Sequence, residues 1–370
     1  MPKNQSKFNL SRQKRALLLL EWATGFHPAG SVWVLLLGLR GFSLVEIGMV
    51  ESIFHMVSLC GELPSGLLAD LLGRKRTLLF SQAMFALSAL LMAASGGMAG
   101  VCLAMAASAL AWNLQSGTRE AITYESMLQA GQECAYLKFS SLQNGLFRLS
   151  SGGAMLLAGA TVLLGWRTAY LLDAAVAAAG LCAALALKEP ETGRAPGPVG
   201  FSGFPAALAG VFRDAGAVLR SDKTSRRIMA LNALVGAAAT LTGFFLQQRV
   251  EAAVPVPALL GPALFLLGLG GALAGLATGP LDRLPYGKAV LLTGGGVAAC
   301  VLLARGSRLP ALLAAGLLAG LLDDALQLVS DKRLNARFPS SARATLVSVS
   351  SMAFSLAMIP LSPLFGWLFS

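Results

Sequence analysis

The feature that most constrains how this chain can fold is a series of apolar segments that are each long enough to cross a lipid bilayer. About 20 apolar residues suffice for one helical crossing, and the sequence offers eleven such segments. We expect the first to end near residue 39 and the others to cover residues 43–72, 77–97, 99–124, 138–164, 167–187, 227–248, 257–279, 288–305, 309–331 and 342–368.

The composition agrees with a membrane protein. Of the 370 residues, 55% are hydrophobic and 13% are charged, whereas a soluble domain carries roughly 25% charged residues. The apolar runs lack the strict alternation of apolar and polar residues that a membrane β-barrel shows. A span in lipid must also form the hydrogen bonds of its backbone internally, so we expect helices. The predicted fold class is an all-α polytopic membrane protein.

The distribution of positive charge predicts how the chain is oriented. The net charge is +11, and the cations gather in every second connection between apolar segments, as they do on the cytoplasmic side of membrane proteins. The acid-free start of the chain places the N-terminus in the cytoplasm, in a multi-pass protein of the plasma or inner membrane. This pattern favours a topology signal over nucleic-acid binding. The first apolar run is too long for a signal peptide and lacks a convincing cleavage site.

One tight, basic turn joins the second and third segments. It lies within the run Glu62-Leu63-Pro64-Ser65-Gly66-Leu67-Leu68-Ala69-Asp70-Leu71-Leu72-Gly73-Arg74-Lys75-Arg76. Glycines allow a close backbone approach and a sharp reversal, and the three consecutive cations mark the cytoplasmic side.

This run resembles the signature loop between the second and third helices of the major facilitator superfamily of transporters. Ser116-Gly117-Thr118-Arg119-Glu120-Ala121 with Tyr124-Glu125 is similar to the end of that family's fourth helix, where Asp is commoner than Glu125. Leu334-Asn335 and Arg343-Ala344-Thr345 with Ser348 are similar to the entry into its eleventh helix. The resemblance implies two bundles of six helices, so the twelfth helix is missing here. A truncated gene or fragment accounts for that as well as a natural eleven-helix protein.

A polar interruption predicts the domain organisation. We expect an N-terminal bundle in residues 1–187, a cytoplasmic linker in 188–226 and a C-terminal bundle of five spans in 227–370. Within the linker, Phe204, Leu208, Val211, Phe212, Ala215 and Leu219 share one helical face, which favours a short amphipathic helix over a disordered linker. In the second half, Gly279-Pro280-Leu281-Asp282-Arg283 is a degraded copy of the signature loop, as two repeats would give.

Ionisable and amide side chains within the predicted spans are candidates for the substrate or proton pathway, since each charge there is costly. The resemblance implies that helices one, four, seven and ten line a central cavity, so it places Glu21, Gln115, Arg119, Asp323, Asp324 and Gln327 nearest to a substrate. The alternative is structural pairing, which we favour for Arg148 and Asp173, and His55 is more plausibly packed or pore-facing than a proton relay. The full set of candidates is Glu21, Glu51, Glu62, Gln115, Arg119, Glu120, Arg148, Asp323, Asp324 and Gln327.

A second set of residues is predicted to control gating. Asp70 could accept hydrogen bonds from the free N–H groups at the start of the eleventh span, near residues 340–343, and so join the two bundles on the cytoplasmic side. The alternative is that the loop only determines topology. The set comprises Gly66, Asp70, Gly73, Arg74, Lys75, Arg76, Asp282 and Arg343.

These observations predict a secondary transporter that works by alternating access. Its few charges favour proton-coupled efflux of a hydrophobic or amphipathic compound, with an uptake permease, a non-transporting sensor or assembly protein, or a truncated inactive permease as alternatives. No phosphate-binding loop is found, which argues against ATP-driven transport. The adjacent carboxylates Asp323 and Asp324 diverge by about 100° on a helix, which argues against the catalytic dyad of an intramembrane protease, and we expect the protein not to be an enzyme. Five scattered cysteines and two histidines predict no metal site. We expect no cofactor beyond a proton gradient, no nucleic-acid partner, and a monomer in the bilayer that binds a small-molecule substrate.

Overall fold

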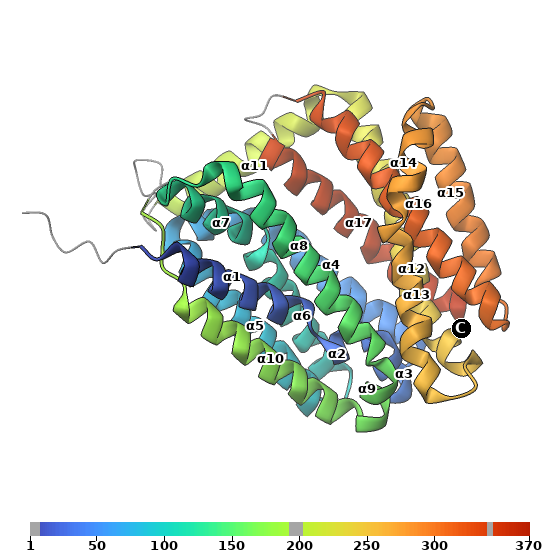
Figure 1. Cartoon of the computed structure of the whole chain (residues 1–370). Helices are drawn as coiled ribbons and strands as arrows, with labels where there is room; N and C mark the ends of the chain where they lie inside the picture. The colour runs from blue at the N-terminus through green and yellow to red at the C-terminus, as the bar shows by residue number, and fades with distance from the viewer. Residues whose placement is uncertain (1–7, 192–202, 339–342) are drawn as a thin grey trace, which may run out of the picture. The chain divides into compact units, whose positions relative to one another are not determined.

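The computed structural model describes residues 8–191, 203–338 and 343–370, and within these ranges the chain forms helices and short connections without strands (Figure 1). Nine helical stretches of the described chain are long and apolar enough to cross a membrane, and the pair α8 and α9, bent by 53°, makes up to ten. The helices are α1 (Leu10–Gly25), α2 (Pro28–Ser31), α3 (Trp33–Leu39), α4 (Leu44–Leu72), α5 (Arg74–Ala94), α6 (Met98–Gln115), α7 (Thr118–Gln129), α8 (Tyr136–Leu156), α9 (Ala158–Leu164), α10 (Trp166–Ala186), α11 (Phe204–Ser221), α12 (Lys223–Ala253), α13 (Leu260–Ala272), α14 (Ala274–Asp282), α15 (Tyr286–Leu303), α16 (Leu309–Asn335) and α17 (Arg343–Phe369).

The predicted all-helical membrane fold is therefore confirmed, but the first predicted span is not one helix. It consists of α1, α2 and α3, none of which is long enough to cross a membrane alone. The first break follows Gly25, and Pro28, which lacks a backbone N–H, starts the next helix. The count of eleven spans stays a prediction.

The described chain divides into two compact units. Unit 1 contains Met1–Gly30, Gly61–Ala154 and Arg167–Ala209, and unit 2 contains Ser31–Cys60, Met155–Trp166 and Gly210–Ser370. The division predicted from the linker at 188–226 stays a prediction, as does the placement of α11 at a membrane surface. Helix α11 itself contains all six residues of the predicted apolar face.

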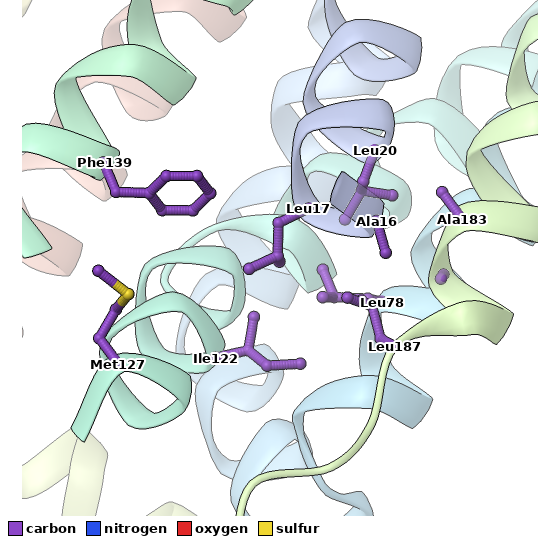
Figure 2. Close-up of a cluster of buried hydrophobic side chains, with 10 residues drawn as sticks. Ala16, Leu17, Leu20, Leu78, Ile122, Met127, Phe139, Ala183 and Leu187 are labelled. Carbon is purple, nitrogen blue, oxygen red and sulfur yellow. The ribbon is translucent and has the colours of Figure 1, made fainter. Parts of the chain in front are cut away.

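Unit 1 is held by an apolar cluster at one end of its helices (Figure 2). Leu17 and Leu20 of α1 lie beside Leu78 of α5, Ile122 of α7 and Leu187, which follows α10, and all five are at most 1% exposed. The buried positions of α1 recur every three or four residues, so the face that carries Leu17 and Leu20 also buries polar residues at 13, 21 and 24. Packing of α1 thereby fixes the position of Glu21.

Unit 2 is organised around α16, which packs against α12, α13, α14 and α15, while α17 packs against α12. Small residues allow these helices to approach closely. A Cβ atom at Gly270 of α13 would stand 2.9 Å from the backbone nitrogen of Leu321 in α16. Close contact of this kind drives helix association in a bilayer, because apolar side chains gain no hydrophobic free energy when they move from lipid into a helix interface.

The first half of α4 belongs to unit 2 and packs tightly on α17. A Cβ at Gly48 would stand 2.7 Å from Cα of Pro363, and one at Gly366 would stand 2.9 Å from Cα of Val45. One turn beyond the Gly48 contact, the Ser52 hydroxyl donates to the carbonyl of Ile359 at 2.6 Å. Pro363 has no N–H to occupy that carbonyl, so the proline creates the acceptor that Ser52 uses.

We predict that Gly48→Val and Gly366→Val each disrupt this packing. Overpacking costs about 1–3 kcal/mol, so both variants should lower the melting temperature of the detergent-purified protein. Gly295→Val is the matched control for unit 2, because nothing lies within 4 Å of a Cβ built at that glycine. An equal loss in all three variants would contradict the proposed contact.

Candidate functional site

The signature loop ties several helices of unit 1 together. Gly73 has φ of 91°, in the region that favours glycine, and turns the chain from α4 into α5. The backbone N–H groups of Arg74 and Lys75 donate to the carboxylate of Glu189 at 2.7 and 2.8 Å. Glu189, which sequence reasoning missed, thus caps the N-terminus of α5 with a negative charge.

The side chain of Arg74 adds two contacts to this loop. It pairs with Asp70 one turn earlier in sequence at 2.8 Å and with Glu125 of α7 at 3.3 Å. Asp70 is 63% exposed at its side chain. The partner predicted for Asp70 lies in residues 339–342, which are outside the described part of the chain, together with the side chain of Arg343. The gating role of Asp70, like those of Gly66, Arg76 and Arg343, stays a prediction.

A buried carboxylate and an arginine meet at the break between α6 and α7. Nη1 of Arg119 donates to Oε1 of Glu21 at 2.6 Å, and Nε of the same arginine donates to Glu120 at 3.1 Å. Glu21 is fully buried, and its second oxygen, Oε2, has no hydrogen-bond partner among the described residues. Arg119 is therefore shared by two carboxylates, of which only Glu120 is exposed.

Gln115 is the last residue of α6, just before the break that precedes Arg119, and belongs to a buried amide and hydroxyl cluster. Its Nε2 donates to Thr24 of α1 at 3.2 Å, and its Oε1 accepts from Gln82 of α5 at 3.2 Å. All three side chains are at most 3% exposed. This arrangement joins α1, α5 and α6, so the contacts of Gln115 are those of a structural residue.

Asp323 and Asp324 of α16 lie on different sides of the helix, as their adjacency requires. The Oδ1 atom of Asp323 stands 3.1 Å from the place of a Cβ at Gly236 in α12, whereas Cγ of Asp324 stands 3.2 Å from a Cβ at Gly271 in α13. The structure therefore directs Asp323 toward α12 and α17 and Asp324 toward α13.

A cavity of about 380 Å³ lies within unit 2 between α12, α16 and α17. Gln327 lines it, together with several residues that were not predicted from the sequence. The amide and hydroxyl residues among them belong to no recognisable sequence motif. The lining residues are Met229, Asn232, Ala233, Gln327, Asp331, Leu334, Asn335, Leu346, Val347, Ser350, Ser351 and Phe354.

A hydrogen-bonded chain crosses one wall of this cavity. Ser330 donates to Asn232 at 3.0 Å, Asn232 donates to Gln327, and Gln327 donates to Asp331 at 3.0 Å. Tyr286 of α15 joins the chain at Ser330, at 3.0 Å. Residues 323, 327 and 331 follow at intervals of four, so they lie on one face of α16.

The remaining candidates lie elsewhere. Glu51 and His55 of α4 form a pair at 3.2 Å, and His55 contacts Ser355 of α17 at 3.2 Å. Asp282 pairs with Lys332 of α16. Glu62 lies half-buried in the unit 1 part of α4, and Arg148 is exposed on α8. The structure does not test whether any of them serves transport.

Asp173 of α10 binds the break between α1 and α2, where its two oxygens accept the backbone N–H groups of Ala29 and Gly30 at 3.1 and 2.8 Å. This is a structural contact, because it satisfies backbone donors that the break leaves without helical partners. The position of Asp173 agrees with the structural pairing that the sequence favoured, although its partners are backbone groups and not an arginine.

Comparisons with known proteins decide the fold. Residues 2–118 match a family model described as sugar (and other) transporter. A nucleoside transporter, NupG, is 16% identical, with a TM-score of 0.78 over 97% of this chain and 91% of that one. A D-xylose-proton symporter is 12% identical, with a TM-score of 0.66 over 96% and 90%. A bacterial homolog of the human lysosomal transporter Spinster is 16% identical, with a TM-score of 0.66 over 98% and 82%.

The chain has the fold of the major facilitator superfamily. The fold that the resemblance of the signature loop implies is thereby confirmed. No curated protein matches the sequence. At 12–16% identity the major facilitator fold is shared, while the substrate is not given by these likenesses.

The pair of Glu21 and Arg119 generates a prediction about stability. Removing one partner of a buried pair leaves an uncompensated charge and costs about 3–5 kcal/mol. We expect Arg119→Gln to lower the free energy of unfolding by about 3 kcal/mol, and Glu21→Gln with Arg119→Gln to restore much of that loss. Urea or thermal unfolding of the purified protein measures both, and a double variant less stable than Arg119→Gln would contradict the pairing.

Proposed function

We propose that this protein is a secondary transporter that moves a small solute across the cell membrane by alternating access. The observation that carries the proposal is the likeness to solved transporters over 97% of the chain, in a protein whose signature loop is engaged in a charged network on unit 1. A cavity with polar walls within unit 2 supplies a place for the solute.

In this proposal the chain crosses the membrane eleven times. Helices α1, α2 and α3 together form the first span, and the bent pair α8 and α9 forms the fifth. Helix breaks at membrane depth are tolerated where other groups satisfy the free backbone, as the Asp173 carboxylate does between α1 and α2. The N-terminus and the signature loop are cytoplasmic, as the distribution of cations indicates.

We further propose that transport is coupled to protons and that Glu21 carries the proton. A carboxylate that is fully buried, with one oxygen bonded to Arg119 and the other unbonded, can exchange a proton when Arg119 moves onto Glu120. Efflux of a hydrophobic or amphipathic compound is our first choice of direction. Uptake is the second candidate, and it is favoured by the likeness to a protein named as a D-xylose-proton symporter.

Counterflow in proteoliposomes tests this function. Liposomes that hold an unlabelled solute should accumulate the labelled solute only when they contain the protein. An imposed proton gradient should change the rate by at least tenfold in the wild type and leave it unchanged in Glu21→Gln. If none of a panel of amines, nucleosides, sugars and lipophilic drugs moves, the protein is a non-transporting one.

The signature loop gives a second test. We predict that Asp70→Asn lowers the counterflow rate at least fivefold while the amount of protein inserted in the membrane is unchanged, because the loss affects gating and not folding. Glu133→Gln is the control, because it neutralises an exposed carboxylate that belongs to neither set of candidate residues. An unchanged rate in Asp70→Asn would reject the gating role.

A further inference from the structure

We propose that the cavity between α12, α16 and α17 is the substrate site and that its ligand is a small organic cation, a protonated amine with an apolar body. This inference rests on the proposed transport function and names the class of substrate for it. Its basis is the charge, the hydrogen-bond direction and the apolar surface of the cavity walls.

The lining of the cavity carries negative charge. Among the residues whose side chains the structure describes, Asp331 is the one charged residue that lines it, and no lysine, arginine or histidine does so. The cations that follow Asp331 in the sequence have other partners: Lys332 pairs with Asp282, Arg333 donates to the carbonyls of Asp282 and Leu284, and Arg337, just after α16, pairs with Asp222. Among the side chains that the structure describes, Asp331 therefore forms no ion pair. Within the described side chains, an anionic solute would meet this carboxylate without a compensating base.

The hydrogen-bonded chain along the wall presents an N–H donor to the carboxylate of Asp331. Because Asn232 accepts from Ser330 through its oxygen, its amide nitrogen is the atom that donates to Gln327. Gln327 in turn donates through its own nitrogen to Oδ1 of Asp331. Both amides thus turn their N–H ends toward the carboxylate and stabilise its negative charge. A protonated amine in the cavity can bond the second carboxylate oxygen with a charge-assisted hydrogen bond.

The aromatic part of the cavity lining suits the apolar body of such a ligand. Phe354 lines it, and the ring is held by an edge contact with His55, with centroids 5.6 Å apart. An aromatic face attracts a cation or packs against an apolar group. Phe354 also lies 3.5 Å from the place of a Cβ at Gly236, to which Asp323 is 3.1 Å distant. A second carboxylate therefore stands near the ring.

Three matched probes separate a cation site from other sites: phenethylammonium, its neutral isostere 2-phenylethanol, and phenylacetate. Uridine serves as a neutral solute rich in hydrogen-bonding groups. Equilibrium dialysis with the full-length protein in lipid nanodiscs should show that phenethylammonium binds at least tenfold more tightly than each of the other three. Equal binding of phenethylammonium and 2-phenylethanol, or tighter binding of uridine, would overturn the proposal.

Variants locate the binding. We expect Asp331→Asn and Asp323→Asn each to weaken the binding of phenethylammonium at least tenfold. The affinity for 2-phenylethanol should stay within twofold of the wild-type value. The control is Glu251→Gln, which removes a carboxylate near the far end of α12 and should leave both probes unchanged. A loss as large in Glu251→Gln as in Asp331→Asn would show a general surface-charge effect and reject the site.

The outcome for this site is separable from the outcome for transport. Selective binding of phenethylammonium without counterflow of any solute would support the cation site and refute the transport function. Counterflow of uridine that Asp331→Asn leaves intact, with no selective binding of the amine, would refute the cation site and support transport. If Asp331→Asn does not fold, the comparison of the four probes on the wild-type protein still decides the proposal.

Discussion

Close approach of helix backbones is the constraint on which the rest of this structure depends. In a bilayer, apolar side chains gain little by moving from lipid to protein, so helices associate through van der Waals packing and hydrogen bonds. Glycines supply that approach where α13 meets α16 and where α4 meets α17. The polar groups considered as sites hold their positions because their helices are fixed at these contacts, as Asp323 is beside Gly236.

The same constraint explains why polar groups in the core of each unit come in clusters. A buried amide or hydroxyl must find a partner within the protein, because the lipid offers none. Gln115, Gln82 and Thr24 satisfy one another in unit 1, and Asn232, Gln327 and Ser330 do so in unit 2. The two clusters differ in accessibility: the first is sealed, while Gln327 and Asn232 face a cavity. Exposure to a cavity, and not polarity alone, separates a candidate binding group from a structural one.

Much of the fold could be predicted from the sequence, since segment length and charge distribution act over whole helices. The signature loop was recognisable because Gly73 is needed for the turn and because its cations follow directly. Partnerships across the fold were not predictable in the same way. Glu189 caps α5 from a distant part of the chain, and Asp331 joins Gln327 at a cavity, yet neither lies in a distinctive motif. The break at Pro28 was also missed, because hydropathy averages over a proline that interrupts the helix.

The carbonyl of Ile359 carries a consequence for how α4 and α17 can part. Because Pro363 has no N–H to offer this carbonyl, the hydroxyl of Ser52 on the neighbouring helix donates to it instead. If the two helices separated, water entering between them could hydrate that oxygen at once, so little enthalpy would be lost on opening. Contact between two helices is readily reversible when water can replace the hydrogen bond that joins them. Two helices held only by interdigitated apolar side chains would separate more slowly.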